Sequence, residues 1–118
     1  MSKAAVVVFA DTETHGDMGR MLNALEMAKE YKDSNDEVTL IFDGAAAKWV
    51  PQLEKKDHKL HSKYVDVKDK VSGVCSFCAE AFGVKNAVKS SGHNLLAEYD
   101  GHPSLKHYLD NGYHVVTF

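Results

Sequence analysis

The chain has 118 residues, of which 44% are apolar and 26% charged, a composition typical of one globular domain, residues 1–118. The formal charge is −3 at pH 7 without any basic run, so neither nucleic acid nor an anionic membrane is expected as a partner. No apolar stretch is long enough to span a bilayer and none has the flanks of a targeting segment, so we expect a cytoplasmic protein.

The first third of the chain predicts two strands and the helix between them. Lys3–Ala10 is a continuous β-branched run, typical of a strand buried on both faces of a parallel sheet. After a polar loop, Asp17 is the expected N-cap of a helix that ends near Lys32. Glu37–Phe42 is the second predicted strand. The helix is indicated by apolar residues at helical spacing, namely Met18, Met21, Leu22, Leu25 and Ala28.

The middle of the chain predicts two helices and a third strand. Asp43-Gly44 is a turn, and Ala45–Leu53 has a helical pattern that Pro51 shortens or kinks. Val71–Cys75 is a short predicted strand. A second helix before it is indicated by apolar residues four, three and four positions apart, at Leu60, Tyr64, Val67 and Val71.

The last part of the chain predicts a helix over Cys78–Ser90, broken at Gly83. Asn94–Tyr99 suits either a strand or a loop. A final helix is expected from Pro103, at its first position, to Gly112 at C′. A last strand is expected over Tyr113–Phe118.

Strands and helices that alternate in this way predict an α/β fold, with a mainly parallel sheet covered by helices. In such sheets the reactive groups gather beyond the carboxyl ends of the strands. We therefore expect three loops to meet at one edge: Asp11–Asp17, Asp43–Ala45 and Cys75–Cys78.

The only two cysteines, Cys75 and Cys78, lie three positions apart where a predicted strand passes into a predicted helix. Unpaired backbone N–H groups and the positive end of the helix dipole favour the thiolate there, and the thiolate is the reactive form. We therefore expect Cys75 to be ionised and accessible, and both cysteines to be the catalytic residues.

Three kinds of chemistry fit this CxxC pair. In a dithiol redox protein, the first cysteine attacks and the second resolves the mixed disulfide. Alternatively, Cys75 and Cys78 form a Cys2His2 zinc site with His58 and His61 in a non-catalytic, oligomeric binding or structural protein. A thiolate can also take up sulfane sulfur as a persulfide and pass it on. No cofactor is expected, since the chain has neither a GxGxxG nor a Walker A sequence.

Other polar residues at the expected edge have more ordinary explanations. Asp11 and Asp43 end strands and could bind a metal or act as acid and base, but capping of loops and helices is the commoner use of such residues. His15 is expected to be a solvated loop residue. No role is assigned to His93, His102, His107 or His114.

Several stretches together resemble the DsrE/DsrF-like family, which includes TusD-type sulfur-relay subunits. They are KAAVVVFADTET at the start, the helical Ala24–Ala28, the strand and turn VTLIFDGAA, and HVVTF after Gly112. Cys75 also lies eight residues before the Gly83-Val84 pair, as the family cysteine does. The resemblance covers the chain from end to end.

The resemblance implies a three-layer α/β/α sandwich with about five strands, assembled as a homo-oligomer, often a trimer or hexamer. It also implies that Cys75 carries persulfide sulfur between protein donors and acceptors, as a sulfurtransferase or sulfur carrier. Cys78 departs from the relay pattern, because a second thiol could attack the persulfide and release sulfide. Phe82 stands where relay members have an arginine.

Overall fold

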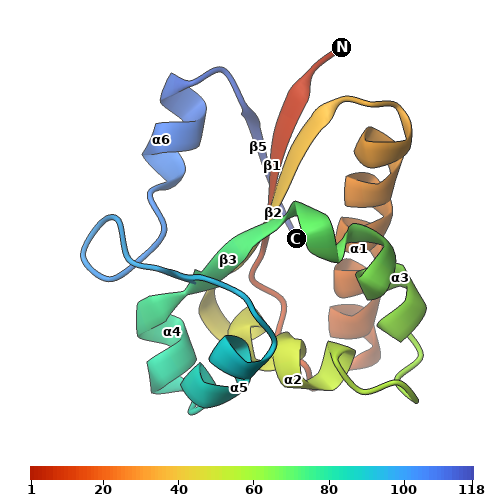
Figure 1. The fold of residues 1–118 in the computed structure, drawn as a ribbon, viewed down its shortest axis with the longest axis vertical. Helices are drawn as coiled ribbons and strands as arrows, with labels where there is room; N and C mark the ends of the chain where they lie inside the picture. Colours follow the sequence, from red (N-terminus) through yellow and green to blue (C-terminus); the bar gives the residue numbers. More distant parts are fainter.

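The computed structural model describes residues 1–118 and contains a sheet of five parallel strands in the order β4-β3-β2-β1-β5 (Figure 1). The confirmed α/β fold follows from strands that alternate with helices along the chain. The strands are β1 (Lys3–Val8), β2 (Glu37–Phe42), β3 (Val71–Cys75), β4 (Leu95–Leu96) and β5 (His114–Thr117).

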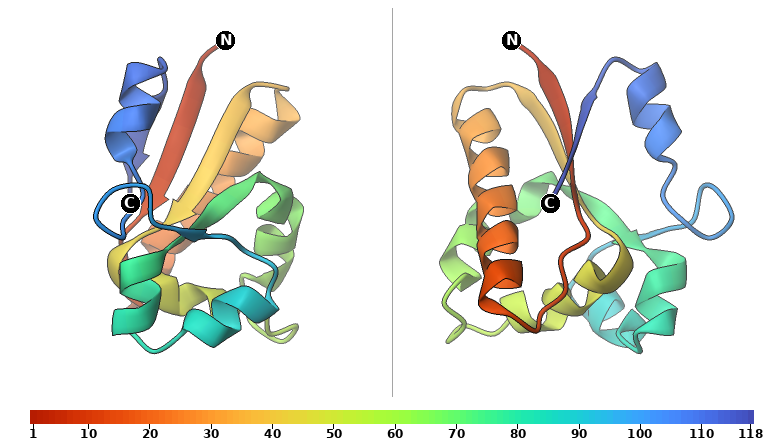
Figure 2. Two further views of the ribbon diagram at one scale, coloured as in Figure 1. Left: turned by 60° about the vertical axis from the view of Figure 1, so that its left-hand side comes forward. Right: turned by 180° about the vertical axis from the view of Figure 1, so that it is seen from behind.

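Helices lie on both sides of the sheet and beyond its carboxyl edge. The long α1 packs with α3 on one side, and α6 lies on the other (Figure 2), which gives the expected three layers. The α-helices are α1 (His15–Asp33), α2 (Trp49–Leu53), α3 (His61–Val67), α4 (Ser76–Ala81), α5 (Lys85–Ser90) and α6 (Leu105–Asp110). Two 3₁₀ helices are η1 (Gly44–Lys48) and η2 (Lys68–Lys70). No helix is both long enough and apolar enough to cross a lipid bilayer.

The strand β1 is buried on both of its faces, as its continuous apolar run predicts. Alternate residues Ala4, Val6 and Val8 join the core beneath α1, while Ala5 and Val7 face the opposite layer and are also 0% exposed. Its two edges are covered as well, because β2 and β5 pair with them. The strand ends two residues earlier than predicted.

The predicted N-cap of α1 is wrong by three residues. Thr14 caps the helix, since its hydroxyl accepts a hydrogen bond from the Asp17 amide, and the Asp17 carboxylate accepts one from the Thr14 amide. This reciprocal pair is a capping box. The Asp17 side chain therefore lies inside the first turn, where the positive end of the helix dipole also stabilises its negative charge.

The helix predicted over Ala45–Leu53 divides into η1 and α2. Asp43 caps η1 through a hydrogen bond from the Gly44 amide to its carboxylate, 2.8 Å long. Pro51 lies in the first turn of the short α2, where the missing amide hydrogen costs little. The Trp49 indole donates to the Ala10 and Asp11 carbonyls at 3.1 and 3.0 Å, and so ties this segment to the loop after β1.

The later helices are shorter than their apolar patterns predict. The pattern from Leu60 to Val71 runs through α3 and η2 into the start of β3. The segment predicted as Cys78–Ser90 begins earlier, at Ser76, and divides into α4 and α5 around Gly83, whose φ is +71°. That left-handed conformation ends α4, because it suits glycine and breaks the helical repeat.

The segment Asn94–Tyr99, which suits either a strand or a loop in the sequence, contains the short strand β4. Leu95–Leu96 pairs there in parallel with β3. Ser104 caps α6, so Pro103 precedes the cap and does not occupy the first helical position. Gly112 follows the C-cap at φ +82°, which confirms its predicted place at C′.

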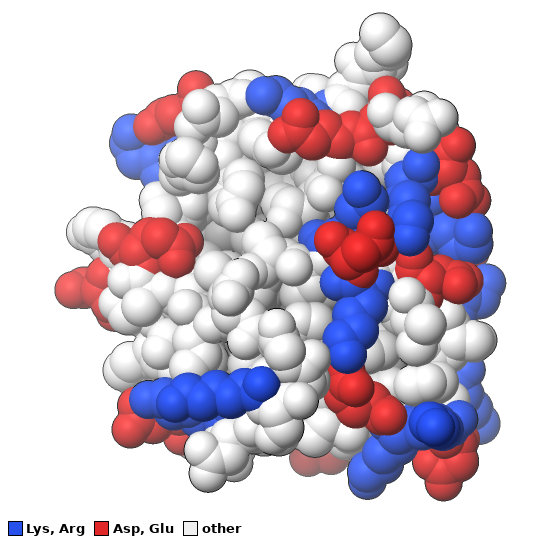
Figure 3. Space-filling model, in the orientation of Figure 1, with Lys and Arg blue, Asp and Glu red and all other residues white.

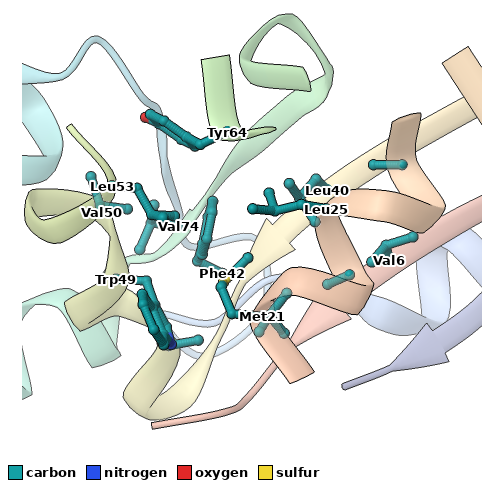
Figure 4. Close-up of a cluster of buried hydrophobic side chains, with 14 of the residues drawn as sticks. Val6, Met21, Leu25, Leu40, Phe42, Trp49, Val50, Leu53, Tyr64 and Val74 are labelled. Atoms are coloured by element: carbon teal, nitrogen blue, oxygen red, sulfur yellow. The ribbon is translucent and has the colours of Figure 1, made fainter. Parts of the chain in front are cut away.

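The main core lies between the sheet and the layer of α1, α2 and α3 (Figure 4). Phe42 at the end of β2 lies among side chains from several elements, including Trp49, Leu53 and Tyr64, and all four are at most 1% exposed. Each large apolar side chain that is buried in this way contributes about 1.5–3 kcal/mol. This packing holds the carboxyl ends of β2 and β3 in place.

Gly73 is the position in β3 where a side chain would meet backbone. A Cβ there would lie 2.6 Å from the Asn94 carbonyl oxygen and 2.7 Å from Leu96 Cγ. We predict that Gly73→Ala lowers the free energy of unfolding by about 1–3 kcal/mol, because β4 must move away. Urea denaturation measures the change.

Gly19→Ala is the matched control, because nothing lies within 4 Å of a Cβ built at this position of α1. An alanine inside a helix should raise the free energy of unfolding by up to about 1 kcal/mol. Equal stabilities for the two variants would contradict the close contact between β3 and the segment that contains β4.

Candidate functional site

Four side chains meet at the carboxyl edge of the sheet, and their potential ligand atoms all lie within 4.8 Å of one another. Asp43 follows β2, Cys75 ends β3, and Cys78 lies in the first turn of α4. The fourth residue, His102, belongs to the loop before α6. We call this set the thiol cluster: Asp43, Cys75, Cys78 and His102.

Cys75 occupies the N-cap position of α4, and its Sγ accepts a hydrogen bond from the Cys78 amide at 3.4 Å. The side chain is nevertheless 0% exposed. Burial raises the pKa of the Cys75 thiol from 9.0 to about 12, and the Cys78 amide opposes this rise only in part. The expectation of an ionised, accessible Cys75 is therefore wrong for the isolated chain, because desolvation outweighs the amide donor.

A tight turn at Asp100-Gly101 covers this sulfur. Tyr99 and His102 exchange two backbone hydrogen bonds of 2.9 and 2.8 Å, and the two residues between them have φ values of +55° and +82°. Such a pair of positive φ angles suits an Asp-Gly sequence. The turn is joined to α4 where the Phe77 amide donates to the Gly101 carbonyl at 2.9 Å.

The turn brings His102 against Cys75. Nδ1 of the imidazole lies 3.3 Å from Cys75 Sγ, and the ring packs on Phe77 with 4.9 Å between the ring centroids. Because burial keeps Cys75 protonated, we assign the thiol as the donor and Nδ1 as the acceptor, which puts the imidazole proton on Nε2. This is the arrangement of a thiol beside a general base.

Cys78 and Asp43 form the other half of the cluster. The Cys78 thiol is partly exposed and donates to Oδ1 of Asp43, 3.8 Å away. The Asp43 carboxylate is only 7% exposed and has no lysine or arginine partner, since nearby Lys48 pairs with Asp11 and Glu13. Both cysteines are free thiols in this structure.

The zinc ligand set predicted from Cys75, Cys78, His58 and His61 is wrong, because neither histidine joins the thiol cluster. His58 Nδ1 accepts from the Leu60 amide at 3.0 Å, and its ring packs edge-on against Trp49. His61 Nδ1 is 2.7 Å from the Leu53 carbonyl. Both histidines therefore hold the connection between α2 and α3.

The Asp11–Asp17 loop is attached to η1 and adds no side chain to the thiol cluster. Asp11 forms an ion pair of 2.6 Å with Lys48, and this hydrogen bond lowers the pKa of the Asp11 carboxyl. The predicted capping roles of the two aspartates are confirmed, since Asp11 accepts from the Thr12 amide and Asp43 from the Gly44 amide. His15 is exposed, as expected, but it is the first residue of α1 and does not lie in the loop.

The surface around the cluster is apolar but presents no opening to Cys75. Phe77, Phe82 and Tyr99 are 58%, 43% and 71% exposed. Figure 3 shows charged side chains over α1 and α3, while the middle of this face, over β3 and toward α6, carries few. None of the pockets on the molecule is lined by Cys75 or Cys78. Access to Cys75 therefore requires movement of its cover.

His102 is the functional candidate that sequence reasoning missed. His102 lies 27 positions after Cys75, so no local sequence pattern links the two residues. The strand β4, which brings the chain back to this edge, has only two residues and gives a weak signal in the sequence. The available signal was the Asp-Gly dipeptide, which predicts a tight turn immediately before His102.

Comparison with known proteins supports the resemblance seen in the sequence. The sequence model of the DsrE/DsrF-like family matches residues 5–118. An uncharacterized protein of Methanocaldococcus jannaschii is 38% identical in an alignment of 117 positions that covers 97% of this chain and 93% of that protein. A conserved protein of unknown function from Bacteroides thetaiotaomicron has a similar fold, with a TM-score of 0.64 and 21% identity over 97% of this chain and 94% of its own.

The raised pKa of Cys75 predicts a loss of stability in alkali. Between about pH 9 and pH 12 the unfolded chain ionises this thiol while the folded chain keeps it protonated, so the free energy of unfolding falls as pH rises. In wild type, we expect the free energy of unfolding to fall by up to about 1.4 kcal/mol per pH unit in this range. Cys75→Ala should abolish this contribution. Urea denaturation at several alkaline pH values measures it.

Cys78→Ala is the control, because it removes the partly exposed thiol and keeps the buried one. Its free energy of unfolding should still fall with rising pH, as in wild type. If Cys75→Ala and wild type lose stability in parallel above pH 9, the buried thiol is not protonated as described.

Proposed function

Because the chain belongs to the DsrE/DsrF-like family, we propose that it handles sulfane sulfur as a persulfide on Cys75. The observation that carries the proposal is the 3.3 Å contact between Cys75 Sγ and His102 Nδ1. A buried thiol with a raised pKa needs a base, and His102 is within hydrogen-bond reach. The family resemblance supplies the sulfur chemistry, and the contact supplies a way to activate the thiol.

In the proposed uptake step, Cys75 gives its proton to Nδ1 of His102 as its sulfur attacks the outer sulfur of a donor persulfide, R–S–SH. The S–S bond of the donor breaks. The departing R–S⁻ takes the proton from His102, so the products are Cys75–S–SH and R–SH. An acceptor thiol then attacks the outer sulfur of Cys75 and leaves with it, which restores the Cys75 thiol.

Cys78 competes with the acceptor, because its Sγ lies within 4.8 Å of Cys75 Sγ. Its attack on the inner sulfur of Cys75–S–SH forms the Cys75–Cys78 disulfide and releases hydrogen sulfide. A dithiol reductant must then restore the pair. In this scheme Cys78 decides whether sulfur is passed on or released, and the dithiol redox reaction is a branch of the same site.

The apolar surroundings suit delivery by a protein partner. Cys75 is covered by the Tyr99–His102 turn, and Phe77 and Tyr99 beside it are more than half exposed. Contact with a donor, an acceptor or a second copy of the chain would bury these rings and could displace the turn. Homo-oligomeric assembly and protein sulfur donors or acceptors are therefore part of the proposal, as the family resemblance implies.

Exposure to a small persulfide donor, without an acceptor thiol, tests the proposal by mass spectrometry. We expect Cys78→Ser to gain the mass of one sulfur atom on Cys75, and wild type to proceed to the disulfide with release of sulfide. Cys75→Ser should gain no sulfur. Uptake by Cys75→Ser at the wild-type rate would exclude Cys75 as the carrier.

His102→Gln tests the base separately. This variant keeps a polar side chain but accepts a proton poorly, so we expect the rate of sulfur uptake to fall by roughly 10²-fold. The matched control is His114→Gln, since His114 is exposed on β5 and lies outside the thiol cluster. An unchanged rate in His102→Gln would remove His102 from the mechanism.

A further inference from the structure

The thiol cluster contains the donor set of a transition-metal site, which is a property separate from persulfide chemistry. Two sulfur atoms, one imidazole nitrogen and one carboxylate oxygen lie within 4.8 Å of one another. We propose a binding site for one Zn²⁺ ion whose four ligands are Asp43, Cys75, Cys78 and His102.

The spacing of these atoms is near that of a tetrahedral zinc site. Zinc bonds of about 2.0–2.3 Å place neighbouring ligand atoms roughly 3.3–3.8 Å apart. In the structure, Cys75 Sγ is 3.3 Å from His102 Nδ1, and Cys78 Sγ is 3.8 Å from Asp43 Oδ1. The widest separation, up to 4.8 Å, requires adjustments of about 1 Å, which side-chain rotation can supply.

Three separate segments hold the four ligands, and each segment is attached to the fold. Asp43 follows β2 and caps η1, while Cys75 ends β3 and caps α4. Cys78 lies in α4. The Asp-Gly turn, which is bonded to the Phe77 amide, directs His102 toward them. The backbone therefore brings the donors together before any ion arrives, so little ordering is needed on binding.

Charge balance also favours a divalent cation. Asp43 is a nearly buried carboxylate without a cationic partner, beside two thiols. A zinc ion that replaces the two thiol protons leaves the formal charge of the thiol cluster unchanged. It also gives the carboxylate a direct positive partner, which the protein itself does not provide.

The mixture of ligands distinguishes zinc from other metals. Mg²⁺ and Ca²⁺ prefer oxygen ligands throughout, whereas thiolates select softer ions. An iron–sulfur cluster held by cysteines needs more thiolates than this chain has. Two sulfur ligands with one nitrogen and one oxygen match the N, S and O ligands that tetrahedral zinc accepts.

Zinc titration of the reduced, full-length chain tests the proposal, with a chromophoric chelator as competitor and elemental analysis for stoichiometry. We expect one zinc ion per chain. His102→Gln and Asp43→Asn should each weaken binding by roughly 100-fold. The matched controls are His114→Gln and Asp66→Asn, which remove the same groups from exposed positions outside the cluster and should bind zinc as wild type does.

Cobalt substitution of the wild-type chain keeps the test independent of variant folding. Co²⁺ should show the d–d absorption of a tetrahedral ion and thiolate charge transfer, and X-ray absorption of the zinc form should show two sulfur and two nitrogen or oxygen neighbours. Absence of stoichiometric zinc would overturn the proposal. So would octahedral cobalt, or zinc affinity that is unchanged in both His102→Gln and Asp43→Asn.

The proposal does not depend on the persulfide function, and its experiments use different readouts. A chain that binds zinc but takes up no sulfur would support this site and refute the proposed function. A chain that gains sulfur on Cys75 but binds no zinc would support the proposed function and refute the zinc site.

Discussion

The hydrogen bond from the Phe77 amide to the Gly101 carbonyl attaches the Asp100-Gly101 turn to the first turn of α4. This bond decides what surrounds Cys75, because the turn brings His102 to 3.3 Å from the sulfur. Positive φ angles at both central residues make the turn tight enough for this approach. Without the turn, Cys75 would lie at the end of a buried strand with the Cys78 amide as its neighbour but no base.

Burial and polar contacts oppose one another at this site. Burial keeps Cys75 protonated and inert, since it raises the pKa of the thiol to about 12. His102, Cys78 and Asp43 meanwhile place a base, a second thiol and a carboxylate around it. Such a thiol reacts only when its proton is removed by a base or exchanged for a metal ion. Both proposals begin from this constraint and differ in what replaces the proton.

The sequence predicts the sheet well, because its inner strands are rich in apolar and β-branched residues, and the predicted bounds of Glu37–Phe42 are confirmed. Helix starts are less predictable, since Thr14 and Asp17 both suit an N-cap and only the capping box shows which one caps. The cysteine pair was recognisable from spacing. Its ionisation was not, because the helix-start argument is local whereas desolvation depends on the whole fold. His102 was missed because the contact is made through a distant turn.

The pH dependence of sulfur transfer to Cys75 tests the central claim most directly. It is measured in the Cys78→Ser background, with His102 present and with His102 replaced by glutamine. If His102 removes the thiol proton, the form with His102 reacts faster at neutral pH, and the glutamine form approaches its rate only in alkali, toward the raised pKa of the Cys75 thiol. Two profiles that coincide would contradict the account, because Cys75 would then react without its neighbour.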